Sequence, residues 1–136
     1  MTIHSISFQN FRNLKETNLL FDRQLNFING VNASGKTSLL EAIYFLSTGR
    51  SFRTRKFQNI INREGELSEF ILYGRTFDSL QKNLVHSIGI RKSRISKTQI
   101  KLDGQNIYSA SKLACLSPTM VIDPLSFNLL NGPSKV

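Results

Sequence analysis

The sequence is poor in cysteine and in long apolar runs, and each shortage excludes a class of protein. Cys115 is the single cysteine among 136 residues, which excludes an internal disulfide framework and a four-cysteine metal site. A single thiol is typical of a protein in the reducing cytosol. We expect the Cys115 side chain to be buried and structural, not a nucleophile. No apolar run approaches the roughly 18 residues that a membrane-spanning helix needs, and the polar N-terminal residues do not resemble a signal peptide. We therefore expect a soluble cytoplasmic protein with no membrane partner.

Acidic residues are also few, half as many as the basic ones. Lys and Arg number 18 and Asp and Glu number 9, which gives a net charge of +9. Such an excess favours a polyanionic partner, nucleic acid first and an anionic membrane surface second. A surface that is merely basic is the alternative. Tryptophan is absent, but ten phenylalanines and a hydrophobic content of 40% are enough for the core of one ordinary domain.

What the sequence does contain is a phosphate-binding motif. The pattern G-x-x-x-x-G-K-[ST] of a P-loop is matched by Gly30, Val31, Asn32, Ala33, Ser34, Gly35, Lys36 and Thr37. An apolar run at residues 25–28 precedes the motif and predicts a buried strand. Residues 38–46 follow it with apolar side chains on one helical face. A strand that enters the loop and a helix that leaves it are the context that the motif requires.

The fixed positions of this loop have chemical reasons. Its two glycines permit backbone torsions that a Cβ would forbid and allow close approach to a phosphate. The N–H groups of residues 33–37 and the N-terminus of the next helix supply positive potential. Lys36 would reach the β- and γ-phosphates, and the Thr37 hydroxyl would bind Mg²⁺. We therefore predict a nucleotide site, against the alternative of a glycine-rich turn before an ordinary helix.

Hydrophobic periodicity predicts the order of the other elements. The N-terminal part is predicted to contain strands at residues 2–8, 14–21 and 25–28, a helix at 36–47 that Gly49 ends, and a helical turn at 57–61. After a loop at 62–68, an antiparallel sheet is predicted over residues 69–108, with strands at 70–77, 83–91 and 98–102 and a turn at Asp103 and Gly104. The last predicted elements are a helix at 109–116 with Ser109 as N-cap, a strand at 119–122 and a helix at 125–130.

Two basic clusters are candidate DNA contacts, because each cation can neutralise a phosphate. The first consists of Arg50, Arg53, Arg55 and Lys56, and the second of Arg91, Lys92 and Arg94 together with Lys97 and Lys101. Solvated loops are the alternative interpretation of both. Neither cluster contains a base-reading motif, so we expect binding without sequence specificity. His4 and His86 belong to no ligand cluster, and we expect Glu41 at the helix surface or in a supporting role near the metal.

The ordered segments resemble the N-terminal part of the RecF family, bacterial ATPases of recombination and replication-linked repair that are related to SMC-type ABC ATPases. The resemblance lies in residues 11–13, 30–37, 38–44, 49–53, 103–104 and 113–133, and it covers essentially the whole chain. It implies an α/β fold, the N-terminal part of a P-loop NTPase of ABC-ATPase head type with an antiparallel β subdomain. The chain would then be a single incomplete head domain with three parts, at residues 1–68, 69–108 and 109–136.

The resemblance also implies function. It implies an ATP- and Mg²⁺-binding head that forms an ATP-dependent homodimer, binds DNA, and acts with the RecO and RecR mediators in repair and SOS induction. By residue, it implies that Arg12 and Asn13 lie beside the nucleotide and that Asn32 faces the γ-phosphate.

The chain departs from the family in two ways. The family is more than twice as long, and its signature serine segment and acidic Mg²⁺-binding strand have no counterpart here, so ATP hydrolysis is left open. Met120 stands where the family often has a glutamine sensor, and a thioether cannot donate a hydrogen bond. A truncated, non-enzymatic DNA-binding module with a vestigial P-loop is therefore the alternative function. A small-molecule kinase or transporter ATPase is disfavoured by the basic loops.

Overall fold

The fold is built on one six-stranded sheet, in a computed structural model that describes residues 2–62, 67–78 and 84–122. The strands are β1 (Thr2–Gln9), β2 (Thr17–Leu20), β3 (Glu69–Phe77), β4 (Val85–Ser93), β5 (Gln99–Leu102) and β6 (Gln105–Ile107). Their order in the sheet is β2-β1-β3-β4-β5-β6, and every neighbouring pair is antiparallel. Buried and exposed residues alternate along β3, as expected of a sheet with one face on the core.

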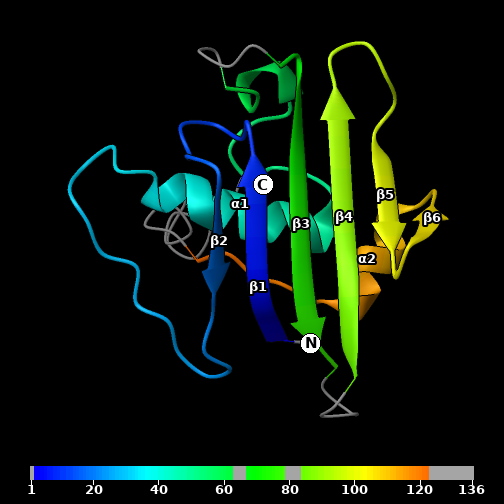
Figure 1. The fold of residues 1–136 in the computed structure, drawn as a ribbon, viewed down its shortest axis with the longest axis horizontal. Helices are drawn as coiled ribbons and strands as arrows, with labels where there is room; N and C mark the ends of the chain where they lie inside the picture. The colour runs from blue at the N-terminus through cyan, green and yellow to red at the C-terminus, as the bar shows by residue number, and fades with distance from the viewer. Residues whose placement is uncertain (1, 63–66, 79–83, 123–136) are drawn as a thin grey trace, which may run out of the picture.

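The helix α1 (Lys36–Thr48) packs across one face of this sheet, behind β1 and β3 in Figure 1. Between them lies a core with three phenylalanine rings in edge-to-face contact. Phe70 lies 5.1 Å from Phe11 and 5.4 Å from Phe45, measured between ring centroids. Such pairs stabilise a core beyond their area burial, by about 0.5–1.5 kcal/mol each. This packing fixes α1, and with it the loop that precedes α1.

The predicted helices and turns in the described residues are confirmed. Gly49 ends α1 with a left-handed φ of 69°, and its amide donates to the Phe45 carbonyl oxygen at 2.7 Å. The predicted helical turn is the 3₁₀ segment η1 (Phe57–Asn59), and the helix α2 (Ala110–Leu116) is N-capped by Ser109. Asp103 and Gly104 both have positive φ, which makes the tight β5–β6 turn.

The antiparallel sheet predicted over residues 69–108 is present and extends further than predicted. β1 pairs with β3 from Thr2 to Gln9 and with β2 on its other side. The first strands of the chain therefore continue the same sheet. The predicted second strand, residues 14–21, is confirmed as the shorter β2.

Two predicted strands are wrong. Residues 25–28 form no strand, and Leu25 and Phe27 are 65% and 87% exposed. Residues 119–122 form none either, and Met120 and Ile122 are largely exposed. An apolar run becomes a strand only where a neighbour accepts its backbone hydrogen bonds, and within the described residues neither segment has one.

Cys115 was also expected to be buried, and it is exposed. Only Leu113 of the short helix α2 is buried, so the face that packs inward does not include the thiol. The predicted helix at 125–130 and residues 63–66 of the predicted loop lie outside the described residues. None of the described helices is long and apolar enough to span a membrane.

Candidate nucleotide-binding site

The loop of residues 30–35 is a run of turns and bends that leads directly into α1. Gly35 has a left-handed φ of 98°, and a Cβ on it would lie 2.8 Å from Leu14 Cδ2. The torsion therefore requires glycine at this position, whereas the Leu14 methyl, at the end of a flexible side chain, can move aside. Ala33 also has a positive φ, of 64°, which is uncommon outside glycine and often marks a functional loop.

Lys36 folds back over this loop. Its Nζ donates to the carbonyl oxygens of Gly30 and Val31 at 2.8 and 2.7 Å. The first turn of α1 contains no acidic residue, and no side chain caps its N-terminus. The ammonium and the helix N-terminus therefore lie together with no carboxylate in that turn, the electrostatics that a phosphate requires.

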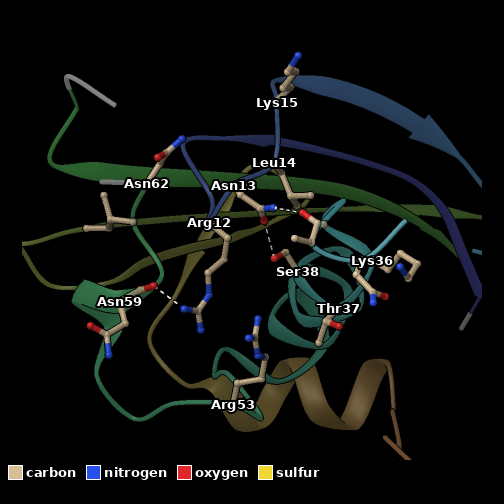
Figure 2. A pocket seen from close by; sticks show the side chains of 14 residues that line it. Arg12, Asn13, Leu14, Lys15, Lys36, Thr37, Ser38, Arg53, Asn59 and Asn62 are labelled. Carbon is tan, nitrogen blue, oxygen red and sulfur yellow. Dashed lines mark hydrogen bonds between the residues drawn. The ribbon is translucent and has the colours of Figure 1, made fainter. Parts of the chain in front are cut away.

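Asn13 connects the loop to the helix. Its Nδ2 donates to the Ala33 carbonyl oxygen at 3.0 Å, and its Oδ1 accepts from the Ser38 hydroxyl at 2.8 Å. Figure 2 shows this amide between the two segments. Asn13 thus holds the loop against α1 and lines the same pocket as Lys36 and Thr37.

Arg12 binds a buried carboxylate on α1. Its guanidinium donates to both oxygens of Glu41, at 2.9 and 2.8 Å, and to the Asn59 carbonyl oxygen at 2.6 Å. Glu41 is 0% exposed and also accepts from Ser51 and, at 3.4 Å, from Arg53. The expectation that Glu41 lies at the helix surface is therefore wrong, because four donors surround its carboxylate in the interior.

These residues surround an open pocket of about 970 Å³. Its cations are Arg12, Lys15, Lys36 and Arg53, and the loop contributes Asn32, Ala33, Gly35 and Thr37. None of the described residues that line it is acidic. Gly30, Val31 and Ser34 complete the loop and do not line this pocket. Cations without lining carboxylates make the pocket suited to a polyphosphate.

The pocket fits Mg²⁺ only together with a phosphate ligand. Thr37 is exposed at the start of α1 and lines the pocket, so its hydroxyl is the protein oxygen available there. The described residues contain no group of three or more metal-binding side chains. Mg²⁺ commonly takes one or two protein ligands and completes its shell with phosphate oxygens and water.

The side chains of the first basic cluster lie in two places, the pocket and the surface. Arg50, Arg55 and Lys56 are exposed, whereas Arg53 turns toward Glu41 and lines the pocket. In the second cluster, Arg94, Lys97 and Lys101 are exposed. Within the described ranges, Arg50, Arg55, Lys56 and Arg94 have no ion-pair partner.

The other two cations of the second cluster are engaged. Arg91 pairs with Glu69 at 2.9 Å, and the hydrogen bond from this carboxylate raises the pKa of Arg91. Lys92 lies 4.9 Å from the centroid of the Phe57 ring, and partial burial lowers the pKa of Lys92. Both side chains therefore have roles within the fold.

Sequence reasoning missed the Glu41 network because its members are distant in the chain. Arg12 precedes Glu41 by 29 residues, and Arg53 follows it by 12. One signal was available: Glu41 lies one helical turn after Thr37, hence on the same side of α1. Asn59 was unforeseeable, because it contributes only a backbone oxygen.

Comparison with known proteins gives relatives along nearly the whole chain. The family model described as RecF/RecN/SMC N terminal domain matches residues 2–126. The DNA replication and repair protein RecF of Yersinia enterocolitica is 38% identical over 135 residues, which are 99% of this chain and 36% of that protein. RecF of Teredinibacter turnerae is 37% identical, over 99% of this chain and 34% of its own length. The chain spans about a third of the length of these relatives.

Solved structures show the same fold. A structure of the recombination mediator protein RecF with ATP, in the RecFOR pathway, superposes with a TM-score of 0.74 at 32% identity, over 82% of this chain and 29% of that one. A second RecF structure, with ATPrS, superposes with a TM-score of 0.84 at 30% identity, over 93% of this chain and 33% of that one. An SMC ATPase structure superposes with a TM-score of 0.81, over 99% of this chain and 93% of that one. Because the identity is only 17%, this match shows the fold alone. The predicted fold class, the N-terminal part of an ABC-ATPase head, is confirmed.

Proposed function

Because the chain belongs to the RecF/RecN/SMC N-terminal domain family, we propose that it is the ATP-binding part of a RecF-like protein of DNA replication and repair. The observation that carries the proposal is the pocket in front of α1. It combines the loop of residues 30–37, the Lys36 ammonium and three further cations with no acidic lining residue among those described. The relatives named RecF support the biological context.

The groups of the pocket have distinct parts in ATP binding. Lys36 exchanges the carbonyl oxygens of Gly30 and Val31 for β- and γ-phosphate oxygens. Thr37 would offer its hydroxyl to Mg²⁺, whose charge would offset that of the phosphates, and Asn32 would face the γ-phosphate. Arg12 donates three of its five N–H groups within the protein, so its others remain available to the ligand.

The proposal is binding, with hydrolysis left to residues other than those that line the pocket. None of the described lining residues carries a carboxylate that could activate water, and phosphoryl transfer depends on such positioned groups. Arg12 and Asn13 line the pocket, which supports the proposal that they lie beside the nucleotide. Asn13 also holds the loop against α1, and Arg12 also joins α1 to the Asn59 carbonyl oxygen.

We further propose that the chain contributes to DNA binding, in the cytoplasm and during repair and SOS induction. Arg50, Arg55, Lys56 and Arg94 are the contacts that the structure favours, because they are exposed and have no ion-pair partner among the described residues. ATP-dependent homodimerisation and action with RecO and RecR belong to the same proposal. The descriptions of the RecF structures in the RecFOR pathway support it.

Substitution of Lys36 tests the nucleotide site. We expect Lys36→Ala to weaken binding of a fluorescent ATP analogue about 10- to 100-fold, because charge-assisted hydrogen bonds contribute roughly 1.5–3 kcal/mol. Lys112→Ala is the matched control, since Lys112 is an exposed lysine on α2 that does not line the pocket. The control should bind the analogue like the wild type. Equal affinity in Lys36→Ala would show that the nucleotide binds elsewhere.

A further inference from the structure

A second groove lies at the opposite end of α1 from the nucleotide pocket. It is bordered by Gly49, which ends α1, by β5 and β6, and by the start of α2, and its volume is about 650 Å³. Figure 1 shows β5, β6 and α2 together at this edge of the sheet. The volume is within the range of ligand-binding pockets. The ATP-binding proposal assigns no role to this groove.

The groove is cationic. Lys97 and Lys101 line it, and both are exposed with no ion-pair partner in the described part of the chain. None of its described lining residues is acidic. Gln99 and Asn106 add amide groups that can both donate and accept hydrogen bonds. These groups complement an anionic ligand that also carries polar edges.

An aromatic ring stands in solvent at the same groove. Tyr108 follows β6, lines the groove and is 97% exposed. Among the described residues it is the most exposed of the large hydrophobic side chains. A ring beside two ammonium groups that have no ion-pair partner among the described residues is the combination that single-stranded nucleic-acid sites use, with bases stacked on the ring and phosphates on the cations.

Lys101 of the groove also lies on the open face of the sheet. Lys101 of β5 lies opposite Asn106 of β6 and opposite Gly89 of β4, and Gly89 in turn lies opposite Tyr73 of β3. Tyr73 is 44% exposed, and its Cδ2 lies only 4.0 Å from where a Cβ on Gly89 would be. Strands are about 4.8 Å apart, so Tyr73 and Lys101 are roughly 10 Å apart on one face. The described helices lie on the other face (Figure 1).

We propose that this groove binds single-stranded nucleic acid. Tyr108 stacks on a base, Lys97 and Lys101 contact the phosphates on either side, and the strand continues over Gly89 to Tyr73. The inference rests on the proposed DNA binding, and it adds the groove and the Tyr108 ring to Lys97 and Lys101, two lysines of the second basic cluster. Because a ring accepts every base, the binding is independent of sequence.

Stacking separates this ligand from the other polyanions. A duplex keeps its bases paired and can use only the lysines, and an acidic peptide has no bases to stack. Removal of the Tyr108 ring should therefore affect oligothymidylate selectively. Since the ring is exposed, its removal leaves the core intact, which circular dichroism verifies.

The test is fluorescence anisotropy with an oligothymidylate of about 15 nucleotides and with a duplex of the same length. We expect Tyr108→Ala to weaken oligothymidylate binding about 5- to 100-fold with little effect on the duplex, because stacking contributes about 1–3 kcal/mol per base. Met120→Ala, at another exposed side chain, is the control and should bind like the wild type. The pair Lys97→Gln and Lys101→Gln should flatten the salt dependence of oligothymidylate binding by about 1.4, which is 2 contacts at roughly 0.7 each.

The charge-matched control is the pair Arg55→Gln and Lys56→Gln, which removes the same charge from the other basic region. A smaller loss of oligothymidylate binding than for the lysine pair supports the groove, and an equal loss overturns it. Unchanged binding in Tyr108→Ala also overturns it, as does a polyglutamate that competes as well as oligothymidylate. If the wild type binds duplex but no oligothymidylate, only this inference fails. If the wild type binds neither duplex nor oligothymidylate, both this inference and the proposed DNA binding fail. The proposed ATP binding is unaffected by that result, because the fluorescent ATP analogue tests it separately.

Discussion

At the scale of single residues, the Glu41 carboxylate is the charge on which the nucleotide pocket depends. It is fully buried, and its bidentate partner Arg12 has a side chain that is only 18% exposed. Loss of one partner from such a pair leaves an uncompensated buried charge, a cost of about 3–5 kcal/mol. Arg12 in turn borders the pocket, so the carboxylate also keeps this guanidinium at the pocket.

We therefore expect Glu41→Ala to lower the free energy of unfolding by roughly 3 kcal/mol. Glu41→Gln should lower it less, because the amide oxygen still accepts from Arg12. The matched control is Glu69→Ala, which breaks a pair of the same chemistry whose arginine side chain is 56% exposed. An exposed ion pair contributes about 0–1 kcal/mol to the free energy of unfolding, so Glu69→Ala should lower it by no more than that. Urea unfolding measures all three, and equal losses for Glu41→Ala and Glu69→Ala would contradict the buried pair.

At the scale of elements, local sequence patterns predicted the helix and the turn whose formation depends on neighbouring residues in the chain. α1 follows from its apolar face and from Gly49, and the β5–β6 turn follows from Asp103 and Gly104. The strand predicted at 25–28 is wrong because strands need partners, which an apolar run does not reveal. Two contacts join segments that are distant in the chain: the pairing of β1 with β3, and the ion pair between Arg12 and Glu41. Local sequence patterns could not predict either of them.

The end of α1 offers a paired test of local conformation against packing. Gly49 and Gly104 both have left-handed backbones, with φ of 69° and 80°. A Cβ on Gly49 would lie 3.0 Å from Ala110 Cβ, whereas a Cβ on Gly104 meets nothing within 4 Å. We expect Gly104→Ala to cost about 1–2 kcal/mol of unfolding free energy, from backbone strain alone. Gly49→Ala should cost more, because α2 must also shift, and equal values from urea unfolding would contradict the close contact.

At the scale of the whole molecule, the proposed contacts with nucleotide and with DNA lie in one short segment. Residues 50–56 place Arg50, Arg55 and Lys56 on the surface, while Arg53 of the same segment lines the nucleotide pocket and contacts Glu41. A ligand that attracts Arg53 therefore acts on the segment that carries the exposed cations. This arrangement distinguishes the proposed ATP-binding head from a DNA-binding module with a vestigial loop, in which nucleotide and DNA would bind independently.

Titration of a DNA duplex across salt concentrations, with and without Mg·ATP, separates these two functions. Arg50, Arg55, Lys56 and Arg94 are 4 exposed cations, so full contact predicts a slope of log K against log salt of roughly −3.6, at about −0.9 per phosphate. We expect Mg·ATP to change the duplex affinity in the wild type and to leave it unchanged in Lys36→Ala. Arg53→Gln should weaken ATP binding, because it removes one of the pocket's cations, and it should lose the coupling even at saturating Mg·ATP, because its guanidinium joins the two regions. Salt-dependent binding that is indifferent to Mg·ATP in the wild type would establish the module instead, since a vestigial loop transmits nothing to residues 50–56.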